Sequence, residues 1–423
     1  MAFQHGLSGL NASSKNLDVI GHNIANANTT GFKSSRAEFA DLVASSMGAG
    51  GGANYGIGVE VAAVAQQFSQ GNVTVTGNNL DVAINGNGFF KVQQADGSAA
   101  YTRAGNFKLD KTGDLVTNGG AQVMGFKVDP TTGASTSEAQ PLSFPTGAPI
   151  QAKQTSAITA VLNLDARANL AAGVPAVVGP PAIAAIPATP RSTYGTSINV
   201  YDTQGVATPV NLYFEKSGPN EWKVFDELVP APPAVPKAAV GTIKFDTNGK
   251  YDPTSLPITL TVKPQANPNA PPVADIVTTL DLSGATQFGS KFAVATGGLS
   301  QDGYASGDLT SINISNDGMV MASYSNGVTR AEAQVALANF RNPQGLLAVG
   351  GNNWVESFDS GPAVLGKPGD GNFGALRSGA LEDSNVDLTA ELVNMMTAQR
   401  AYQANAQTIK TQDQVMSTLV NLR

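Results

Sequence analysis

The sequence predicts a mixed, mainly β fold with a long α-helix at each end of the chain. The first observation is the distribution of proline, since none of the 24 prolines occurs before Pro130 or after Pro368 and 18 of them lie between Pro149 and Pro272. Proline interrupts helix interiors, so long helices are expected only near the two termini. The second observation is hydrophobic periodicity, which follows a helical repeat at both ends and alternates with a period of two between them.

The N-terminal helix is expected within residues 1–30. At alternating spacings of four and three residues, five of seven positions from Phe3 to Ile24 are large and apolar. This spacing places them along one stripe of a helix, as in the seam of a coiled coil. The stripe ends before Gly31, a residue type suited to the left-handed conformation that ends helices. The seam residues of this helix are Phe3, Leu7, Leu10, Leu17 and Ile24.

The C-terminal helix is expected at residues 386–422, which gives a length of about 55 Å at about 1.5 Å per residue. Ten consecutive positions repeat the heptad spacing, and eight of them are apolar. Just before them, Ser384 and Asp387 have the spacing of a capping box. A small globule cannot enclose so long a helix, so we expect it to pair with the N-terminal helix as a coiled coil, with 1–30 and 384–423 forming one helical domain. Its large seam residues are Leu388, Leu392, Met395, Tyr402, Ile409, Met416 and Val420.

The remaining faces of the C-terminal helix carry amides rather than charges. Exposed coiled coils usually carry Glu and Lys beside the seam, whereas this helix has eight Asn and Gln residues. Amides hydrogen-bond to copies of themselves without the desolvation cost of burying ions. One interpretation is a two-helix stalk in water, and the other is a helix pair that packs against further copies of the same chain. The low charge favours the second.

Between the helices, turn residues separate short strand-like runs. The sequence Asn85-Gly86-Asn87-Gly88 lies between apolar runs at 80–84 and 89–92, which predicts a hairpin. Residues 110–114 and 315–318 separate further strand pairs in the same way.

These runs predict nested β-rich domains. Residues 71–147 and 301–375 are expected to form one discontinuous core domain, joined to the helices by linkers at 31–70 and 376–383. Residues 148–300 are expected to form an inserted outer domain with its own core. Each domain except the insertion is therefore built from early and late sequence.

Two features support a separate insertion. Strand-like runs occur at 197–201 and 210–214, which would supply a core of its own. The Pro/Ala-rich stretches at 174–190 and 229–240 are expected to be surface loops of this domain.

Composition excludes several classes of function. The 423 residues include no cysteine, which excludes disulfides, thiolate metal sites and cysteine nucleophiles. Only His5 and His22 are histidines, and the net charge of −7 comes without any basic block, which argues against nucleic-acid binding. No run approaches the roughly 20 apolar residues that span a bilayer, and the first residues lack the pattern of a cleavable secretion signal. We expect a protein that is not an enzyme and that has no cofactor, metal, nucleic-acid or membrane partner.

Short chemical motifs are better explained as structure. Gly86-Asn87-Gly88 lacks the third glycine of a dinucleotide fingerprint. Residues 110–114 and 246–249 lack the ligand series of a calcium loop and are expected to be turns. Glu382 and Asp383 precede the C-terminal helix, where negative charge suits the helix dipole.

Several longer motifs resemble the family of bacterial flagellar rod and hook proteins. They occur in the family's order and cover roughly residues 1–130 and 300–423. The motifs are LDVIGHNIANANTTGFK at 17–33, GNGFFKV at 86–92, YTRAGNF at 101–107, NFRNPQGL at 339–346, GALEDSNV at 379–386 and MMTAQRAYQAN at 395–405. The signature residues carried over from the first motif are Asn23, Ile24, Ala25, Asn26, Gly31, Phe32 and Lys33.

The resemblance implies a structural subunit of the hook, because rod proteins generally lack a large domain between the two β halves. It implies a helical homopolymer, a curved tube that acts as a universal joint and transmits torque from rod to filament. It also implies contacts with rod, hook cap and hook–filament junction proteins, and export to the cell exterior through the flagellar type III apparatus without a cleaved signal. A distal rod protein remains an alternative, as does a secreted β-rich adhesin or binding protein.

Overall fold

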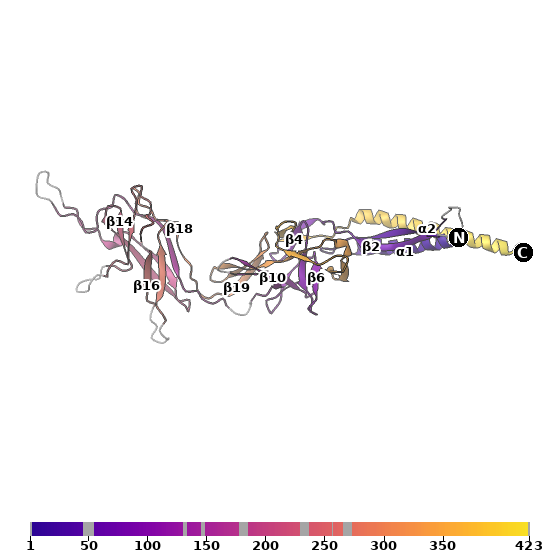
Figure 1. Ribbon diagram of the computed structural model, residues 1–423, viewed down its shortest axis with the longest axis horizontal. Coiled ribbons are helices and arrows are strands. Elements are labelled where there is room, and N and C mark those ends of the chain that lie inside the picture. The colour runs from indigo at the N-terminus through magenta and orange to yellow at the C-terminus, as the bar shows by residue number, and fades with distance from the viewer. Residues whose placement is uncertain are drawn as a thin grey trace. The chain divides into compact units, whose positions relative to one another are not determined.

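The computed structural model describes residues 2–44, 55–129, 133–144, 149–176, 185–228, 237–255, 257–264 and 273–421 (Figure 1). The chain forms two compact units. Unit 1 consists of Met1–Gly147, Thr310–Ser323 and Thr329–Arg423, and unit 2 consists of Ala148–Leu309 and Tyr324–Val328. Within the described residues, no helix combines the length and hydrophobicity needed to span a membrane.

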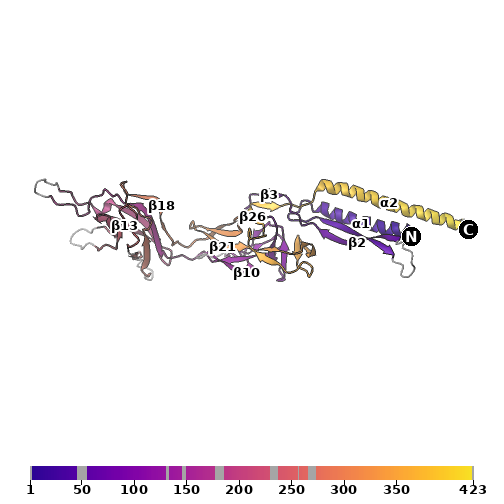
Figure 2. The same ribbon diagram turned by 45° about the horizontal axis from the view of Figure 1, so that its top comes forward.

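The two terminal helices lie side by side in unit 1 (Figures 1 and 2). Helix α1 spans Ala2–Ala25 and helix α2 spans Leu388–Asn421. Gly6 of α1 lies against Ile409, whereas Asn23 bonds to Glu391 at the other end of α2, so the helices run antiparallel. The prediction of a mainly β fold with paired terminal helices is therefore confirmed.

The helix ends differ in detail from the sequence prediction. Helix α2 begins after Asp387, whose Oδ1 accepts hydrogen bonds from the backbone N–H groups of Thr389 (2.9 Å) and Ala390 (3.1 Å). Asp387 is therefore the N-cap, and the Ser384 hydroxyl instead accepts from Val386 N–H ahead of the helix. Helix α1 stops at Ala25, and the chain turns over the next six residues to Gly31, which adopts φ +70°.

A long β-hairpin follows α1 where the sequence predicted a linker. Strands β1 (Ser35–Ala44) and β2 (Tyr55–Gln66) pair antiparallel, with two irregularities in their register. The hairpin packs on α1, where the His5 ring nitrogen Nε2 lies 2.6 Å from Gly56 O. Alanine and glycine interrupt the alternation of apolar residues in this segment, which weakens the sequence signal for strands. The glycine-rich run 48–52 lies outside the described residues.

The rest of unit 1 is a β region built from early and late segments of the chain. Its main sheet follows the order β19-β20-β21-β9-β5-β6-β24-β23, while β26 pairs with β4 and β27 with β3. Leu309 and Tyr324, at the ends of two of these strands, are grouped with unit 2. The strands are β3 (Val73–Val75), β4 (Val82–Asn85), β5 (Phe89–Gln93), β6 (Ala99–Thr102), β7 (Lys108–Leu109), β8 (Leu115–Val116), β9 (Gln122–Val128), β10 (Ser135–Pro141), β19 (Leu309–Ile314), β20 (Met319–Tyr324), β21 (Thr329–Val335), β22 (Leu337–Asn339), β23 (Leu347–Gly350), β24 (Asn353–Val355), β25 (Val364–Gly366), β26 (Ala375–Ser378) and β27 (Ala380–Glu382).

The three predicted hairpins have different outcomes. Strand β7 pairs with β8 and β19 pairs with β20, as expected. The strands on either side of residues 85–88 do not pair with each other, because β4 pairs with β26 and β5 pairs with β6, β9 and β22. Gly86 and Gly88 both adopt positive φ angles, so the local turn signal was sound but the strand partners come from distant sequence.

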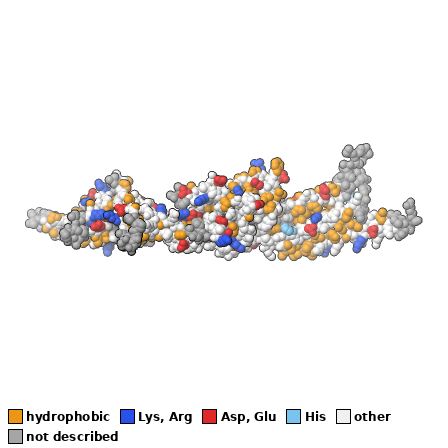
Figure 3. Space-filling view, turned by 90° about the horizontal axis from the view of Figure 1, so that it is seen from below, with side chains coloured by type: hydrophobic (Ala, Val, Ile, Leu, Met, Phe, Trp, Pro, Cys, Tyr) orange, Lys and Arg blue, Asp and Glu red, His pale blue; other side chains and the backbone are white. Residues whose placement is uncertain are grey.

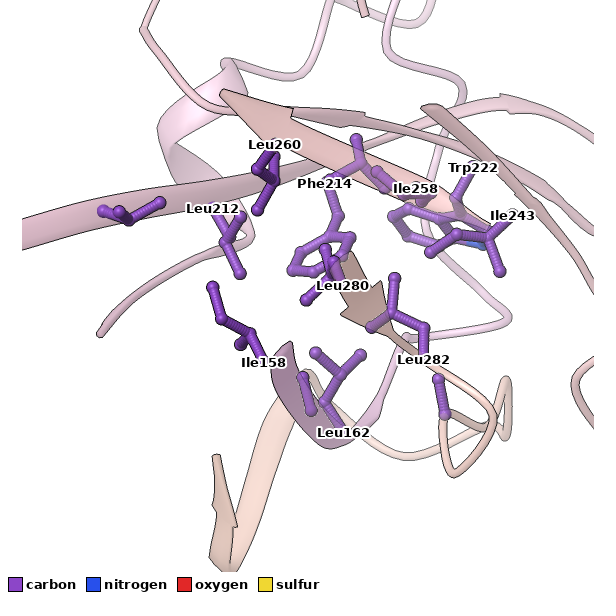
Figure 4. Packing of buried hydrophobic residues seen from close by; sticks show 14 of the residues in the cluster. Ile158, Leu162, Leu212, Phe214, Trp222, Ile243, Ile258, Leu260, Leu280 and Leu282 are labelled. Carbon is purple, nitrogen blue, oxygen red and sulfur yellow. The ribbon is translucent and has the colours of Figure 1, made fainter. Parts of the chain in front are cut away.

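Unit 2 is built from two four-stranded sheets that share one hydrophobic core (Figure 4). The sheet orders are β16-β17-β11-β18 and β12-β13-β14-β15. The side chains of Phe214, Leu260 and Leu280 point toward one another in this core. The strands are β11 (Ala157–Asn163), β12 (Gly195–Tyr201), β13 (Ala207–Gly218), β14 (Glu221–Phe225), β15 (Gly241–Lys244), β16 (Ile258–Val262), β17 (Ile276–Asp281) and β18 (Ala293–Gln301).

The boundaries of unit 2 lie close to the predicted insertion. The unit begins at Ala148, but it extends past residue 300 to Leu309 and includes Tyr324–Val328. Most of the predicted Pro/Ala-rich loops, at 177–184 and 229–236, lie outside the described residues.

Candidate self-assembly surface

Small and polar residues form the closest contacts between the terminal helices. A Cβ atom on Gly9 would lie 2.9 Å from the side-chain nitrogen of Asn405, and a Cβ atom on Gly6 would lie 3.0 Å from Cγ1 of Ile409. Asn405 Nδ2 also lies 3.4 Å from the Ser13 hydroxyl. The two glycines therefore allow the helix backbones to approach closely.

Most of the predicted apolar seam lies beside this contact, and Ile409, which lies against Gly6, is the seam residue named within it. Leu7, Leu388, Leu392, Tyr402 and Met416 are between 37% and 56% exposed. Leu10, Leu17, Ile24, Met395 and Ile409 are partly buried, and the side chains of Phe3 and Val420 lie outside the described ones.

Seam and contact residues are neighbours in sequence. Gly6, Gly9 and Ser13 each precede a position of the predicted α1 seam by one residue. Periodicity alone does not show which of two adjacent stripes faces the partner helix when one contains the small residues that permit close approach.

Helix α2 presents an apolar face that nothing in unit 1 covers within the described residues. Besides its predicted seam residues, Val393, Met396 and Val415 are about half exposed. Hydrophobic side chains also gather over the part of unit 1 that holds the terminal helices and the β1–β2 hairpin (Figure 3). Exposed apolar patches of this kind mark interaction surfaces in soluble proteins.

A groove of about 250 Å³ lies between the two helices and the hairpin. Small residues line its helical walls, including Gly9, Ala12 and Ala401, and Phe39 and Val59 line its hairpin side. No acidic or basic residue lines this groove, so it adds an uncharged concave surface beside the helix pair.

A buried cluster of charges, which we call the polar junction, joins the ends of both helices to the β region. It consists of Lys33, Arg103 and Glu382. The Lys33 ammonium lies 2.7 Å from Glu382 Oε1, and the Arg103 guanidinium lies 3.2 Å from Oε2. Lys33 and Glu382 have fully buried side chains. Burial lowers the pKa of Lys33 and that of Arg103, and the negative charge of Glu382 opposes both shifts.

Glu382 therefore has a different structural role from the one that its position before a helix suggested. It ends strand β27, six residues before α2, and its carboxylate also accepts a hydrogen bond from Gly71 N–H at 2.9 Å. Its backbone carbonyl accepts from Gly31 N–H at 2.8 Å. Removing one partner of such a buried ion pair is strongly destabilising, because the other charge remains without compensation.

The signature residues of the N-terminal motif lie around this junction. Asn23 is buried and donates from Nδ2 to Ser35 O (2.8 Å) and to the Glu391 carboxylate (3.2 Å), which links α1, β1 and α2. Asn26 donates from Nδ2 to His22 O at the end of α1. A Cβ atom on Gly31 would lie 2.6 Å from Ala104 N, so that position requires glycine.

The other signature residues differ in burial. Phe32 is buried, with its ring centroid 5.4 Å from that of His22. Ile24 is partly buried and Ala25 is exposed. Sequence reasoning did not single out Asn385, which lies in the motif at 379–386 and whose side-chain oxygen accepts from Ser34 N–H at 2.7 Å.

The acidic turns do not form metal sites within the described residues. Asp110 accepts hydrogen bonds from the backbone and hydroxyl of Thr112, and Asp246 accepts from Asn248 and Lys250 N–H at 2.8 Å. These are turn-stabilising bonds, and no three acidic or histidine side chains of the described residues cluster as metal ligands.

Four family models match the chain in sequence order. They are the flagella basal body rod protein model at residues 3–33, the flagellar hook protein FlgE/F/G D1 domain at 83–159, the flagellar basal body protein FlaE D2 domain at 163–304 and the flagellar basal body rod FlgEFG protein C-terminal model at 377–422.

Known proteins match over the whole length. The flagellar hook protein FlgE of Escherichia coli (strain K12) is 42% identical and that of Salmonella typhimurium is 43% identical, each with 100% of both chains covered. The crystal structure of the Helicobacter pylori flagellar hook protein FlgE2 superposes with a TM-score of 0.51 at 18% identity, covering 73% of this chain and 100% of that chain, which shows a shared fold. Since full-length relatives exceed 40% identity, the chain belongs to the flagellar hook protein family.

Proposed function

We propose that this chain is a structural subunit of the flagellar hook that polymerises with copies of itself through its terminal helices. The observation that carries the proposal is the apolar face of α2, where Leu388, Leu392 and Met396 are more than 40% exposed although the helices are already paired. Burial of that face against a neighbouring copy would remove it from water. The role is structural and not enzymatic, as in the hook protein family.

The predicted seam residues are part of this proposal. Leu7, Leu10, Leu17 and Ile24 of α1, together with Met395, Tyr402 and Met416 of α2, would contact further copies, because Gly6, Gly9 and Ser13 face α2 within the chain. Ile409 would instead contribute to the pairing within the chain, since it lies against Gly6. We also propose that both helices gain most of their order on assembly, since helices of this kind are stabilised mainly by packing. Slow hydrogen exchange of residues 388–418 in the monomer, as slow as in the core of unit 2, would contradict this.

Unit 2 would form the outer, bending layer of the polymer. The outward face of its sheet β16-β17-β11-β18 presents mainly uncharged residues, among them Thr259, Val277 and Thr279, with Asp281 at the end of β17. Surfaces without fixed ion pairs can slide past one another, which a curved universal joint requires as each row of subunits shortens and lengthens. Family membership further supports contacts with rod, hook cap and hook–filament junction proteins, and export through the flagellar type III apparatus without a cleaved signal.

Electron microscopy of purified protein under salting-out conditions tests the proposal. The full chain is compared with a version that lacks residues 1–30 and 386–423. Curved tubes from the full chain alone are expected. Straight tubes would favour a rod protein, and equal polymers from both versions would exclude the terminal helices as the assembly surface.

A further inference from the structure

A rigid loop in unit 1 presents a fully exposed aromatic side chain. Phe358 is completely accessible to solvent, although aromatic side chains gain more than most others from burial. It lies between β24 and β25, outside both terminal helices. Exposure of this apolar ring to water is less favourable than its burial would be.

Hydrogen bonds hold this loop in one conformation. The Ser357 hydroxyl donates to Gly345 O at 2.6 Å, and the Ser360 hydroxyl accepts from Ser357 N–H at 2.9 Å. Asn342 Nδ2 donates to Asp359 O at 3.1 Å. Ser360 itself is buried, and the two bonds of Ser357 are partly buried, whereas the bond from Asn342 is exposed.

The motif at 339–346 forms the platform of the loop. Residues Pro343–Gly345 make a 3-10 turn, and a Cβ atom on Gly345 would lie 2.5 Å from Ser360 N. Only glycine permits this approach. The platform and the loop together position Phe358 without giving its ring any contact in the monomer.

An apolar sheet edge adjoins the loop. Strand β23 ends the main sheet of unit 1 and pairs only with β24 among the described residues. All four of its residues are exposed, including Leu347 and Val349. Leu347 pairs with Val355, three residues before Phe358. Proteins protect such an edge with charge, proline, shortness or a β-bulge. Strand β23 has no charge or proline, but it is short and its pairing with β24 is irregular between Ala348 and Gly350. Its exposed apolar side chains, rather than its backbone groups, are therefore the feature that a partner would cover.

The charged residue nearest this edge is engaged internally. Between Leu346 and Phe358 the only acidic or basic residue is Glu356. Its carboxylate accepts from Ala363 N–H at 3.1 Å and lies 3.4 Å from the Tyr101 hydroxyl. Asp359, the next residue after Phe358, is exposed, so the loop carries a charge beside the ring, whereas strand β23 carries none. A hydrogen-bonded loop that presents an exposed aromatic side chain next to an uncharged edge strand has the properties of an interface anchor.

We propose that Phe358, with Leu347 and Val349, anchors a contact to a second copy of this chain. The inference rests on the proposed function, since a polymer supplies a neighbouring copy at every subunit. A helical polymer grows through heterologous contacts, in which one surface meets a different surface of the next subunit. Phe358 would therefore insert into another part of the neighbour and not pair with its own counterpart.

The test uses the full chain and three variants. Phe358→Ser is expected to raise the critical concentration for polymerisation at least about tenfold, whereas Phe358→Leu, which keeps an apolar side chain, should polymerise within about threefold of the parent. The thermal unfolding of the monomers should be unchanged, because the ring makes no contact there. Normal polymerisation of Phe358→Ser would overturn the inference alone.

A single introduced thiol gives a second readout, because the chain has no cysteine. In Phe358→Cys the thiol is expected to react with a maleimide at least about tenfold more slowly in polymers than in monomers. Equal reactivity in both states would overturn the inference while leaving the proposed function intact. Failure of the parent chain to polymerise would instead overturn the proposed function and, with it, this contact.

Discussion

Apolar side chains are buried in unit 2 but largely exposed on the terminal helices of unit 1. In unit 2, the side chains of Leu212, Phe214 and Trp222 are completely buried between two sheets. In α2, seven large apolar side chains are between 37% and 56% exposed, whereas Ala398 is buried. Unit 2 completes its core within one chain, while the helices leave apolar side chains exposed, which we propose neighbouring copies cover. Exposure of periodic apolar residues thus distinguishes an assembly surface from a folding core.

The largest expected effect comes from opening the core of unit 2. Trp222 packs edge-on against Tyr194 at 5.4 Å, and its Nε1 donates to Gln287 Oε1 at 3.0 Å. Trp222→Ala should lower the free energy of unfolding of unit 2 by about 3–5 kcal/mol. Urea denaturation followed by circular dichroism measures this loss, and the remaining Trp354 reports unit 1, whose transition should not move. The exposed control Val277→Ala should change stability by less than about 0.5 kcal/mol.

A loss of about 3–5 kcal/mol is also expected for Glu382→Gln, because Lys33 and Arg103 would then be buried without a counter-charge. The variant tests whether the buried polar junction attaches the helices to the β region of unit 1, even though the outer faces of the helices are exposed to solvent. The midpoint of the unit 1 transition, followed by Trp354 fluorescence, measures the effect. Asp383→Asn is the matched control, since Asp383 is partly exposed and lies 3.2 Å from the Thr74 hydroxyl. Equal losses for the two variants would exclude the polar junction as the main attachment.

A smaller, pH-dependent effect is expected within unit 2. Burial would raise the pKa of Asp302, but hydrogen bonds from the Ser156 hydroxyl and Ala157 N–H and the ammonium of Lys153 hold that pKa well below its ordinary value. A carboxyl with a depressed folded-state pKa gives its full stabilisation above its unfolded-state pKa near 3.8. This stabilisation begins to fall below that pH and is lost completely only when the pH has passed through the lower, folded-state pKa.

Asp302→Asn should therefore cost about 1–2 kcal/mol at pH 7, after allowance for partial solvent screening, and progressively less as the pH falls below about 3.8 toward pH 2. Denaturation of the parent and the variant at a series of pH values measures the difference. Asp281→Asn, on the exposed face of β17, serves as the control. A constant difference from pH 7 to pH 2 would show that Asp302 acts by shape and not by charge.

Sequence patterns predicted the elements better than their partners. The absence of proline and the heptad repeats located both helices to within a few residues, because these signals are local. The contact stripe of α1 escaped prediction, because Gly6, Gly9 and Ser13 are not apolar and their value lies in close approach to Asn405 and Ile409. Similarly, the turn at 85–88 was visible, but the pairing of β4 with β26 depends on residues almost 300 positions away.

The polar junction was only partly predictable. Lys33 was included through a motif and Glu382 through its position near a helix, but their contact spans 349 residues. No local signal indicates that two such charges will meet in a buried place. The β1–β2 hairpin was missed for a different reason, since its alanines and glycines reduce the period-two contrast on which strand prediction depends.

The smallest effect on the monomer is expected on the exposed face of α2, and it sharpens the opening comparison. Leu392→Ser should change the free energy of unfolding of the monomer by no more than about 1 kcal/mol, because 41% of the residue is already exposed. The same variant should raise the critical concentration for polymerisation about tenfold, the equivalent of about 1.4 kcal/mol per contact. Sedimentation of polymers across a concentration series measures this, with Gln407→Ser, on another exposed position of α2, as the control.

If Leu392→Ser destabilised the monomer instead, its side chain would belong to the folding core. The contrast between the buried core of unit 2 and the exposed apolar residues of the helices would then fail at that residue. A change confined to the polymer would show that one periodic pattern can encode a helix in the monomer and a separate interface in the assembly.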